Sequence, residues 1–252
     1  VASNAITAED GVKKRDEVLN GLYSAVTDNP YEVRYFRTLT QALFQKLNDV
    51  FAEINSRQVA ERQPKPEETA KIQDLTLRTI NAIKKIQTLD PQNVAVVVDA
   101  GESYRNLAPL VQGAEDLAIE SYEKASELEP INPFIKTQLG LLYLIKSNLF
   151  NSNAVADADT VAKARGILEK ALELNPNYAN ARYFLALIQD KEGNKKEALE
   201  NFILLKQTNP DNKLIAEIIS NLEKGLPALG IPTQPALPPG SPQAAATKGV
   251  PK

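Results

Sequence analysis

At the end of five amphipathic stretches along this chain, Asn, Asp or Glu is followed directly by proline. The five pairs are Asn29-Pro30, Asp90-Pro91, Glu129-Pro130, Asn175-Pro176 and Asn209-Pro210. Proline lacks a backbone N–H and clashes with the preceding helical turn, so each pair forbids further helix. The recurrence predicts an all-α chain built from a repeated helical unit, and it argues against most classes of enzyme.

The last three units also share an internal spacing. Alanine stands twelve residues before the proline, and an aromatic residue or leucine stands eight before it. These sets are Ala118/Tyr122/Pro130, Ala164/Leu168/Pro176 and Ala198/Phe202/Pro210. Pro176 and Pro210 are 34 residues apart, which is the period of the tetratricopeptide repeat. Leu139-Gly140-x-x-Tyr143 matches the Leu-Gly-x-x-Tyr of that family, and we expect a large side chain at Gly140 or Ala164 to push two crossing helices apart.

The chain therefore resembles the tetratricopeptide repeat family over about residues 13–224. The resemblance implies a right-handed α-solenoid of helix-turn-helix repeats, with a concave groove that holds peptides or other proteins. It does not imply catalysis, and we expect no enzymatic activity.

The predicted organisation is a tetratricopeptide solenoid over residues 1–224 and a Pro-rich, non-helical tail over 225–252. The solenoid divides into a half-repeat at 8–30, repeats at 31–91, 94–130, 133–176 and 179–212, and a terminal helix at 213–224. In the long repeat at 31–91, helices are expected from Val33 to about Arg57 and from about Glu67 to Leu89, because Gln63-Pro64-Lys65-Pro66 breaks the chain between them. Val94–Val98 is a β-branched run with strand propensity, but its place in the repeat predicts a helix.

Composition removes several classes of function. A net charge of −3 gives no electrostatic reason to expect a nucleic acid partner. No apolar run approaches the ~20 residues of a membrane span, so this chain is not expected to insert into a membrane. Cys, His, Met and Trp are all absent, which leaves no thiolate nucleophile, no imidazole base and no ordinary zinc site. We expect no cofactor and no metal.

The absence of Met makes Val1 a processed or excised end, or a fragment boundary. Removal of a signal peptide or of an upstream membrane segment would produce such an end. We therefore expect a bacterial, extracytoplasmic location, either periplasmic or at the cell surface.

The family resemblance implies that set positions on the first helix of each repeat line the groove. The groove residues expected here are Tyr35, Leu39, Val98, Glu102, Arg105, Phe134, Thr137, Leu141, Tyr183, Leu187 and Asp190. Repeats that grip a peptide carboxylate place Lys, Asn and Arg at such positions, and only Arg105 and Asn180 are of that kind here. The surface suits a hydrophobic or Pro-rich segment instead. The alternative is that several of these side chains simply pack against neighbouring repeats.

Two acidic patterns have structural explanations. The insert Asn151–Asp159 alternates oxygen ligands, but Val155, Ala156 and Ala162 break the calcium-binding EF-hand pattern. Asp159 or Thr160 is expected to cap the following helix instead. Asp99 and Glu102 could serve a glycosidase, but exposed acids on a helix face explain them better.

The tail holds seven of the chain's 16 prolines and no acid. Such a segment favours polyproline II and loses little entropy on docking. The residues expected to dock on a protein surface are Leu226, Leu229, Ile231, Pro232, Pro235, Leu237 and Pro238.

Three functional hypotheses follow. The first is a self-assembling structural subunit whose tail docks on a neighbouring copy, which would form filaments because head-to-tail contacts do not close. The second is a module that binds a foreign peptide or protein and forms the soluble end of a larger membrane protein, an arrangement similar to the repeat domains of bacterial O-antigen-ligase-like proteins. The third, an acid-only enzyme, has the least support.

Overall fold

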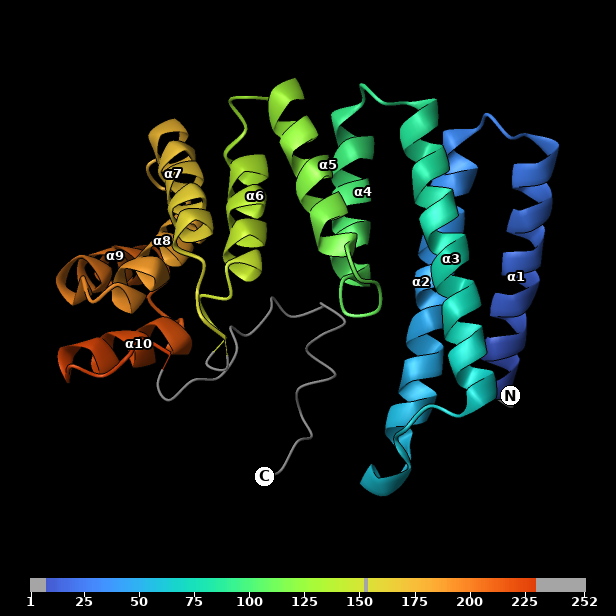
Figure 1. Cartoon of the computed structure of the whole chain (residues 1–252), viewed down its shortest axis with the longest axis horizontal. Coiled ribbons are helices and arrows are strands. Elements are labelled where there is room, and N and C mark those ends of the chain that lie inside the picture. The colour runs from blue at the N-terminus through green and yellow to red at the C-terminus, as the bar shows by residue number, and fades with distance from the viewer. Residues whose placement is uncertain (1–7, 152–153, 230–252) are drawn as a thin grey trace, which may run out of the picture. The chain divides into compact units, whose positions relative to one another are not determined.

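The computed structural model describes residues 8–151 and 154–229, and every regular element in this part is helical. The α-helices are α1 (Ala8–Asp28), α2 (Val33–Ser56), α3 (Pro66–Leu89), α4 (Val94–Leu107), α5 (Ala114–Leu128), α6 (Pro133–Lys146), α7 (Ala158–Leu174), α8 (Ala179–Lys191), α9 (Lys195–Thr208) and α10 (Lys213–Glu223) (Figure 1). One 3-10 turn, η1, spans Val59–Glu61. The predicted all-α class is confirmed.

Helices stop at the acid-proline and amide-proline pairs, as the sequence predicts. The backbone N–H of the residue before each proline still bonds a helical carbonyl, for example from Asp90 to Ile86 at 3.1 Å and from Glu129 to Ala125 at 2.9 Å. The proline that follows cannot make the next such bond. The pairs therefore set the helix ends that the repeat needs.

The individual helices also follow the repeat register. The β-branched run Val94–Val98 is helical at the start of α4, where Asn93 accepts the Ala95 N–H at 3.1 Å as the N-cap. Its side chains pack as helical residues, because Val96 and Val97 are buried. Tertiary packing outweighs strand propensity here.

The residues that define the repeat spacing form the core. Ala118, Tyr122, Ala164, Leu168, Ala198 and Phe202 are all fully buried. A Cβ on Gly140 in α6 would lie 2.8 Å from both Cγ and Cδ2 of Leu168 in α7. The expectation that a small residue is needed at Gly140 is therefore confirmed.

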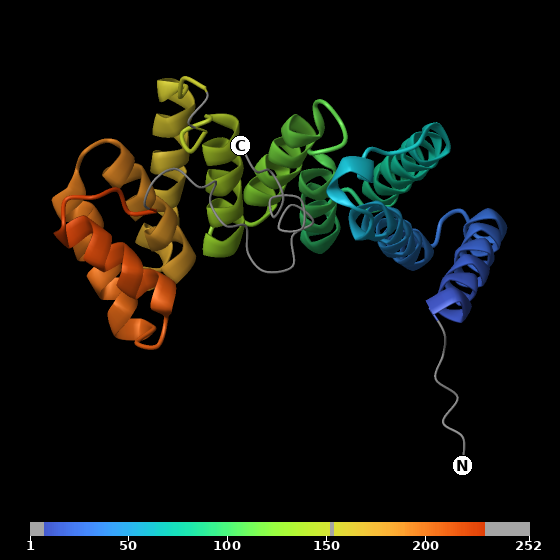
Figure 2. The same cartoon turned by 90° about the horizontal axis from the view of Figure 1, so that it is seen from below.

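Contacts divide the helices into two compact units, one of α1–α4 and one of α5–α10. The division falls between Gln112 and Gly113, inside the predicted repeat 94–130. In the first unit, α2 packs on α1 and α3, and α3 packs on α4. In the second, each helix from α5 to α10 packs on the next one along the chain, and Figure 2 shows α9 beside α10.

None of the helices in residues 8–151 and 154–229 is both long enough and apolar enough to cross a bilayer.

Candidate ligand-binding cavity

Helices α2, α3 and α4 of the first unit line a cavity of about 260 Å³. Its apolar walls come from all three helices, and most of these side chains are buried. They are Phe44, Ile83, Ile86, Val96 and Ala100. The polar lining comes from α2 and α4 alone and consists of Arg37, Thr40, Gln41, Asp99, Glu102, Ser103 and Asn106.

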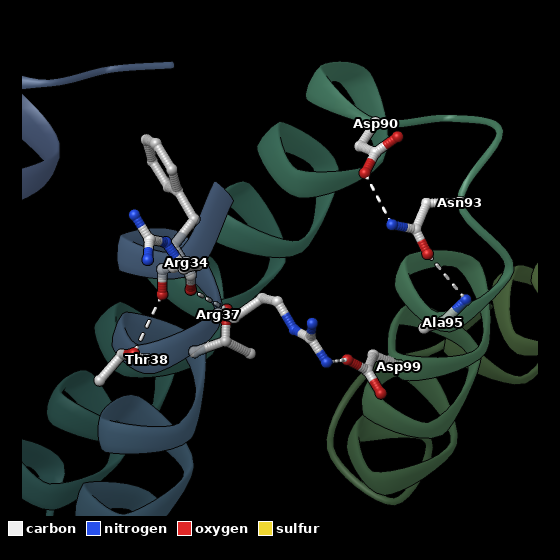
Figure 3. Close-up of polar contacts among 9 residues, drawn as sticks. Arg34, Arg37, Thr38, Asp90, Asn93, Ala95 and Asp99 are labelled. Atoms are coloured by element: carbon white, nitrogen blue, oxygen red, sulfur yellow. Dashed lines mark hydrogen bonds and ion pairs between the residues drawn. The ribbon is translucent and has the colours of Figure 1, made fainter. Parts of the chain in front are cut away.

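An ion pair spans the cavity from α2 to α4. The Arg37 guanidinium donates to Oδ2 of Asp99, and both side chains are about half exposed (Figure 3). The start of α4 is fixed independently, because the Asn93 amide donates to Asp90 Oδ2 at 2.8 Å while its oxygen caps the helix. The cavity therefore has a charged edge held in place from both sides.

The size and lining of the cavity favour a short stretch of polypeptide. Its volume lies below the ~300–1,000 Å³ of typical small-molecule sites, so it suits one or two side chains. The buried floor is apolar, while the side-chain amides of Gln41 and Asn106 make no hydrogen bond to another residue in the described part of the chain. Amides of this kind can both donate to and accept from a peptide backbone.

The residues that the sequence predicts for the groove of the first unit lie in different environments. Tyr35 is 39% exposed, whereas Leu39 is buried. Val98, Glu102 and Arg105 are half-buried, and Arg105 forms an ion pair with Glu102. Only Glu102 of these five lines the cavity.

Most of the predicted groove residues in the second unit pack inside it. Thr137, Leu141, Leu187 and Asp190 are buried, and Tyr183 is partly buried against the apolar cluster of α8–α10. Only Phe134, at 41% exposure, lies on the surface. The alternative that several of these side chains serve packing therefore describes this unit better than an open groove does.

The sequence pattern missed the cavity for a geometric reason. The family positions fall on the first helix of each repeat, but Ile83 and Ile86 come from α3, a second helix. Arg37 and Asp99 are 62 residues apart, and their opposite charges alone do not predict that these two side chains form an ion pair. The sequence pattern singled out Asp99 only as a neighbour of Glu102, in a possible pair of catalytic carboxylates.

The predicted tail-docking residues fall into two groups. Leu226 is half exposed, and Leu229 packs against the apolar cluster of α8–α10. The others, Ile231, Pro232, Pro235, Leu237 and Pro238, lie outside the described residues.

A second polar cluster braces α5, α6 and α7. The Tyr143 hydroxyl donates to Glu123 at 2.5 Å and accepts from Lys163 Nζ at 2.5 Å. Burial, followed by the Glu123 carboxylate, raises the pKa of Tyr143, and hydrogen bonding to Tyr143 raises the pKa of Lys163. Both groups therefore stay protonated at neutral pH, which suits a structural role rather than a nucleophile or base.

The cap of α7 differs from the sequence prediction. Asp157, not Asp159 or Thr160, is the N-cap, and it accepts the N–H groups of those two residues at 3.1 and 3.2 Å. Because the Asp157 N–H itself bonds the Ser147 carbonyl at 2.9 Å, the insert closes onto the end of α6 and the helix starts earlier. Within the part of the chain that the structure describes, no group of three acidic side chains lies close enough to hold a metal ion.

Comparison with known proteins finds a repeat family that matches part of the chain. The tetratricopeptide repeat model matches residues 156–222, which cover α7 to α10 apart from the last residue of α10. The chain is 34% identical over 83 residues to the Photosystem I assembly protein Ycf3 of Prochlorococcus marinus (strain MIT 9215). That stretch is 31% of this chain and 48% of the relative, so the chain spans about half the length of the curated relative it matches.

Two solved structures share the fold at low sequence identity. MamA has a TM-score of 0.53 at 14% identity, and the match covers 83% of this chain and 97% of that one. A thermophilic TPR protein of Thermus thermophilus has a TM-score of 0.50 at 15% identity, covering 85% of this chain and 93% of that one. The family model thus supports the tetratricopeptide repeat over residues 156–222, and the two solved structures support the helix-pair fold.

Proposed function

We propose, from the tetratricopeptide repeats that these matches support, that the protein is a non-catalytic scaffold that binds a segment of a partner protein. The observation that carries this proposal is the cavity between α2, α3 and α4, with its buried apolar floor and the Arg37–Asp99 pair at its edge. The acids that could have served an enzyme, Asp99 and Glu102, are each engaged by an arginine.

The chemistry of the lining selects an extended peptide with an apolar anchor. One apolar side chain of the ligand would enter against Ile83 and Val96, because burying it there removes apolar surface from water. The Gln41 and Asn106 amides would hydrogen-bond the ligand backbone on either side of that anchor. Affinity comes from the anchor and orientation from the amides.

The test is a selection of random peptides displayed on phage against the intact protein. We expect the enriched peptides to share an apolar anchor and to bind Ser103→Trp about tenfold or more weakly, because the indole would fill the cavity; tenfold corresponds to about 1.4 kcal/mol. Asp99→Asn should also weaken binding, because it frees the Arg37 side chain from its fixed position.

Asp74→Asn is the matched control. Asp74 forms an exposed ion pair with Arg78 on α3 and does not line the cavity, so this change removes a similar charge pair elsewhere. Peptides that bind all three variants as tightly as the wild type would place the binding site outside the cavity and contradict the proposal.

A role in assembly is the favoured biological setting. The curated relative carries the name of an assembly protein, and a scaffold that holds one segment of a subunit while a complex forms would use such a cavity directly. The similarity covers less than half of that relative, so this role rests on the binding test above.

Self-assembly is the second form of the proposal. Its support is the apolar start of the tail, where Leu226 is half exposed and Leu229 already packs on helices. In this form the tail of one copy docks on another, and the protein is an extracytoplasmic structural subunit. A soluble end of a larger, O-antigen-ligase-like bacterial membrane protein is the alternative that the sequence raised. Particle size separates these two forms, as argued below.

A further inference from the structure

The chain folds back on itself directly after α10. We call residues Gly225–Leu229 the C-terminal strap. Gly225 has a left-handed backbone, with φ of 75°, and its N–H bonds the Leu222 carbonyl at 2.9 Å. The Leu226 N–H then bonds the Asn221 carbonyl at 2.9 Å, and Lys195 of α9 donates to the Gly225 carbonyl. These bonds turn the strap away from the axis of α10.

The strap ends in a notch that holds both sides of one residue's backbone. The Ala228 N–H donates to Oδ2 of Asp190 at 2.8 Å, while the Ala228 carbonyl accepts from the Asn221 amide at 3.3 Å. Ala228 is only 1% exposed, so the notch admits a small side chain. Asp190 and Asn221 thus recognise the backbone, while the burial of Ala228 restricts the side chain at that position to a small one.

The notch lies on residues that the family resemblance assigns to a ligand groove. Asp190 and Leu187 of α8 are predicted groove residues, and both are buried. Ala228 belongs to the same apolar cluster as Leu187, and Leu229 and the partly buried Tyr183 pack against that cluster. The chain's own strap therefore bonds one predicted groove residue, Asp190, and shares an apolar cluster with another, Leu187.

We propose that the strap is a resident pseudo-ligand that closes a second peptide site, formed by Asp190, Asn221 and the apolar cluster of α8–α10. The site fits an extended segment of the strap's own chemistry, in which a small residue is held by its backbone and followed by a leucine. A foreign segment must displace the strap to bind. This site lies in α8–α10 and does not depend on the cavity in the first unit.

The contact at Asp190 leaves room for exchange. Its Oδ1 atom is buried and has no hydrogen-bond partner among the described residues, although an ionised carboxylate can accept several bonds. A buried acceptor left unpaired opposes docking of the strap. Gly225 supplies the hinge, because glycine adopts left-handed conformations without strain.

The first measurement is hydrogen exchange on the intact chain. We expect the Ala228 amide to be protected and its exchange to speed up when a synthetic peptide of residues 225–232 is added in excess, because the peptide competes for the notch. An Ala228 amide that exchanges as fast as an exposed one, or that ignores the peptide, would overturn the proposal.

The second measurement uses the full chain with its strap released. Ala228→Asp places a charge in the buried apolar cluster, on the residue whose backbone N–H bonds Asp190, so the strap should leave the notch. Labelled peptide 225–232 should then bind this variant about tenfold or more tightly than the wild type, because a site that is open only part of the time shows a proportionally weaker apparent affinity.

Three controls make this result specific. Ala216→Asp, on the exposed face of α10, should bind the peptide as weakly as the wild type. Adding Asp190→Leu to Ala228→Asp, or placing Asp at the 228 position of the peptide, should abolish binding. Exchange protection of α8–α10 in the released variant reports that the unit remains folded. Equal peptide binding by wild type and released variant, or no binding by a folded released variant, would overturn the proposal.

Discussion

At the scale of single residues, two glycines on neighbouring helices have opposite roles. Gly140 of α6 leaves no space for a side chain, because atoms of the fully buried Leu168 lie only 2.8 Å from where its Cβ would be. Gly166 of α7 has no atom within 4 Å of such a Cβ. One glycine permits a close helix crossing, whereas the other only lowers helix propensity.

Gly140→Leu should therefore lower the free energy of unfolding by about 1–3 kcal/mol, which is the cost of forcing extra atoms into a packed interface. Gly166→Ala should raise it by about 0.5–1 kcal/mol, because alanine is the better helix former. Urea unfolding of Gly140→Leu, Gly166→Ala and the wild type measures these two changes in the free energy of unfolding. Equal effects at the two positions would contradict the role assigned to Gly140.

At the scale of elements, the Glu68 carboxylate stabilises the connection between α2 and α3. Glu68 in the first turn of α3 accepts from Arg57 at the end of α2, with Nη1 to Oε2 at 3.0 Å, and from the Lys65 N–H at 2.8 Å. Both the Glu68 and Arg57 side chains are largely buried. These hydrogen bonds, first that to Arg57 and then that to Lys65, lower the pKa of Glu68 from 4.5 to about 2.

The sign of this shift gives a pH prediction. A lowered folded-state pKa contributes stability that is present above pH 4.5 and is lost as pH falls toward about 2. Wild type should thus be more stable than Glu68→Gln at neutral pH, and the gap should close across that window. Thermal unfolding at a series of pH values measures it. The exposed neighbour Glu67→Gln should change unfolding little, and a gap that stays constant down to pH 2 would exclude the assigned pairing.

Helix positions were more predictable from sequence than helix ends. The proline pairs and the repeat register predicted α2, α3 and α10 to within about a residue or two, and predicted a helix at the start of α4, because proline geometry acts locally. The cap of α7 was missed because Asp157, which caps the helix, lies only two residues before the predicted Asp159 and three before Thr160, and all three side chains can cap a helix. Their choice depends on the bond from the Asp157 N–H to Ser147, which belongs to the tertiary structure.

At the scale of the whole molecule, each of the two compact units carries one candidate site. The repeat pattern predicted single residues of each site, Glu102 in the cavity and Leu187 and Asp190 at the notch, but not the pairings that form the two sites. The cavity needs Arg37 to meet Asp99 across 62 residues, and the notch needs Ala228 to return to Asp190 across 38. Repeat spacing predicts which residues share a helix face. It does not predict contacts between residues of different elements that lie tens of residues apart in the sequence.

The tail prediction can now be tested with a better end point. A chain ending at Lys224 would remove Ala228 and leave the Asp190 carboxylate without its N–H donor, so α8–α10 should lose about 1–3 kcal/mol of stability. A chain ending at Leu229 should keep that stability. Hydrogen exchange of the backbone amides in α8–α10 measures the stability of this unit in the two truncated chains.

Particle size by light scattering then tests self-assembly without that loss. Large assemblies of the intact chain that vanish when it ends at Leu229 would establish the remaining tail as an intersubunit tether. Monomers in both forms would exclude self-assembly and leave the scaffold for a foreign segment.

A docked strap also limits how fast a ligand can bind at the notch. If Ala228 must leave Asp190 before another segment can enter, the observed association rate at that notch levels off at the opening rate of the strap, however much ligand is added. Among the described residues, the cavity of the first unit is lined by α2, α3 and α4 alone, so we expect its association rate to rise in proportion to ligand concentration. The protein would thus have one site that binds fast, the cavity, and one that binds slowly, the notch. A partner that binds both sites would bind the cavity first and the notch only after the strap has opened.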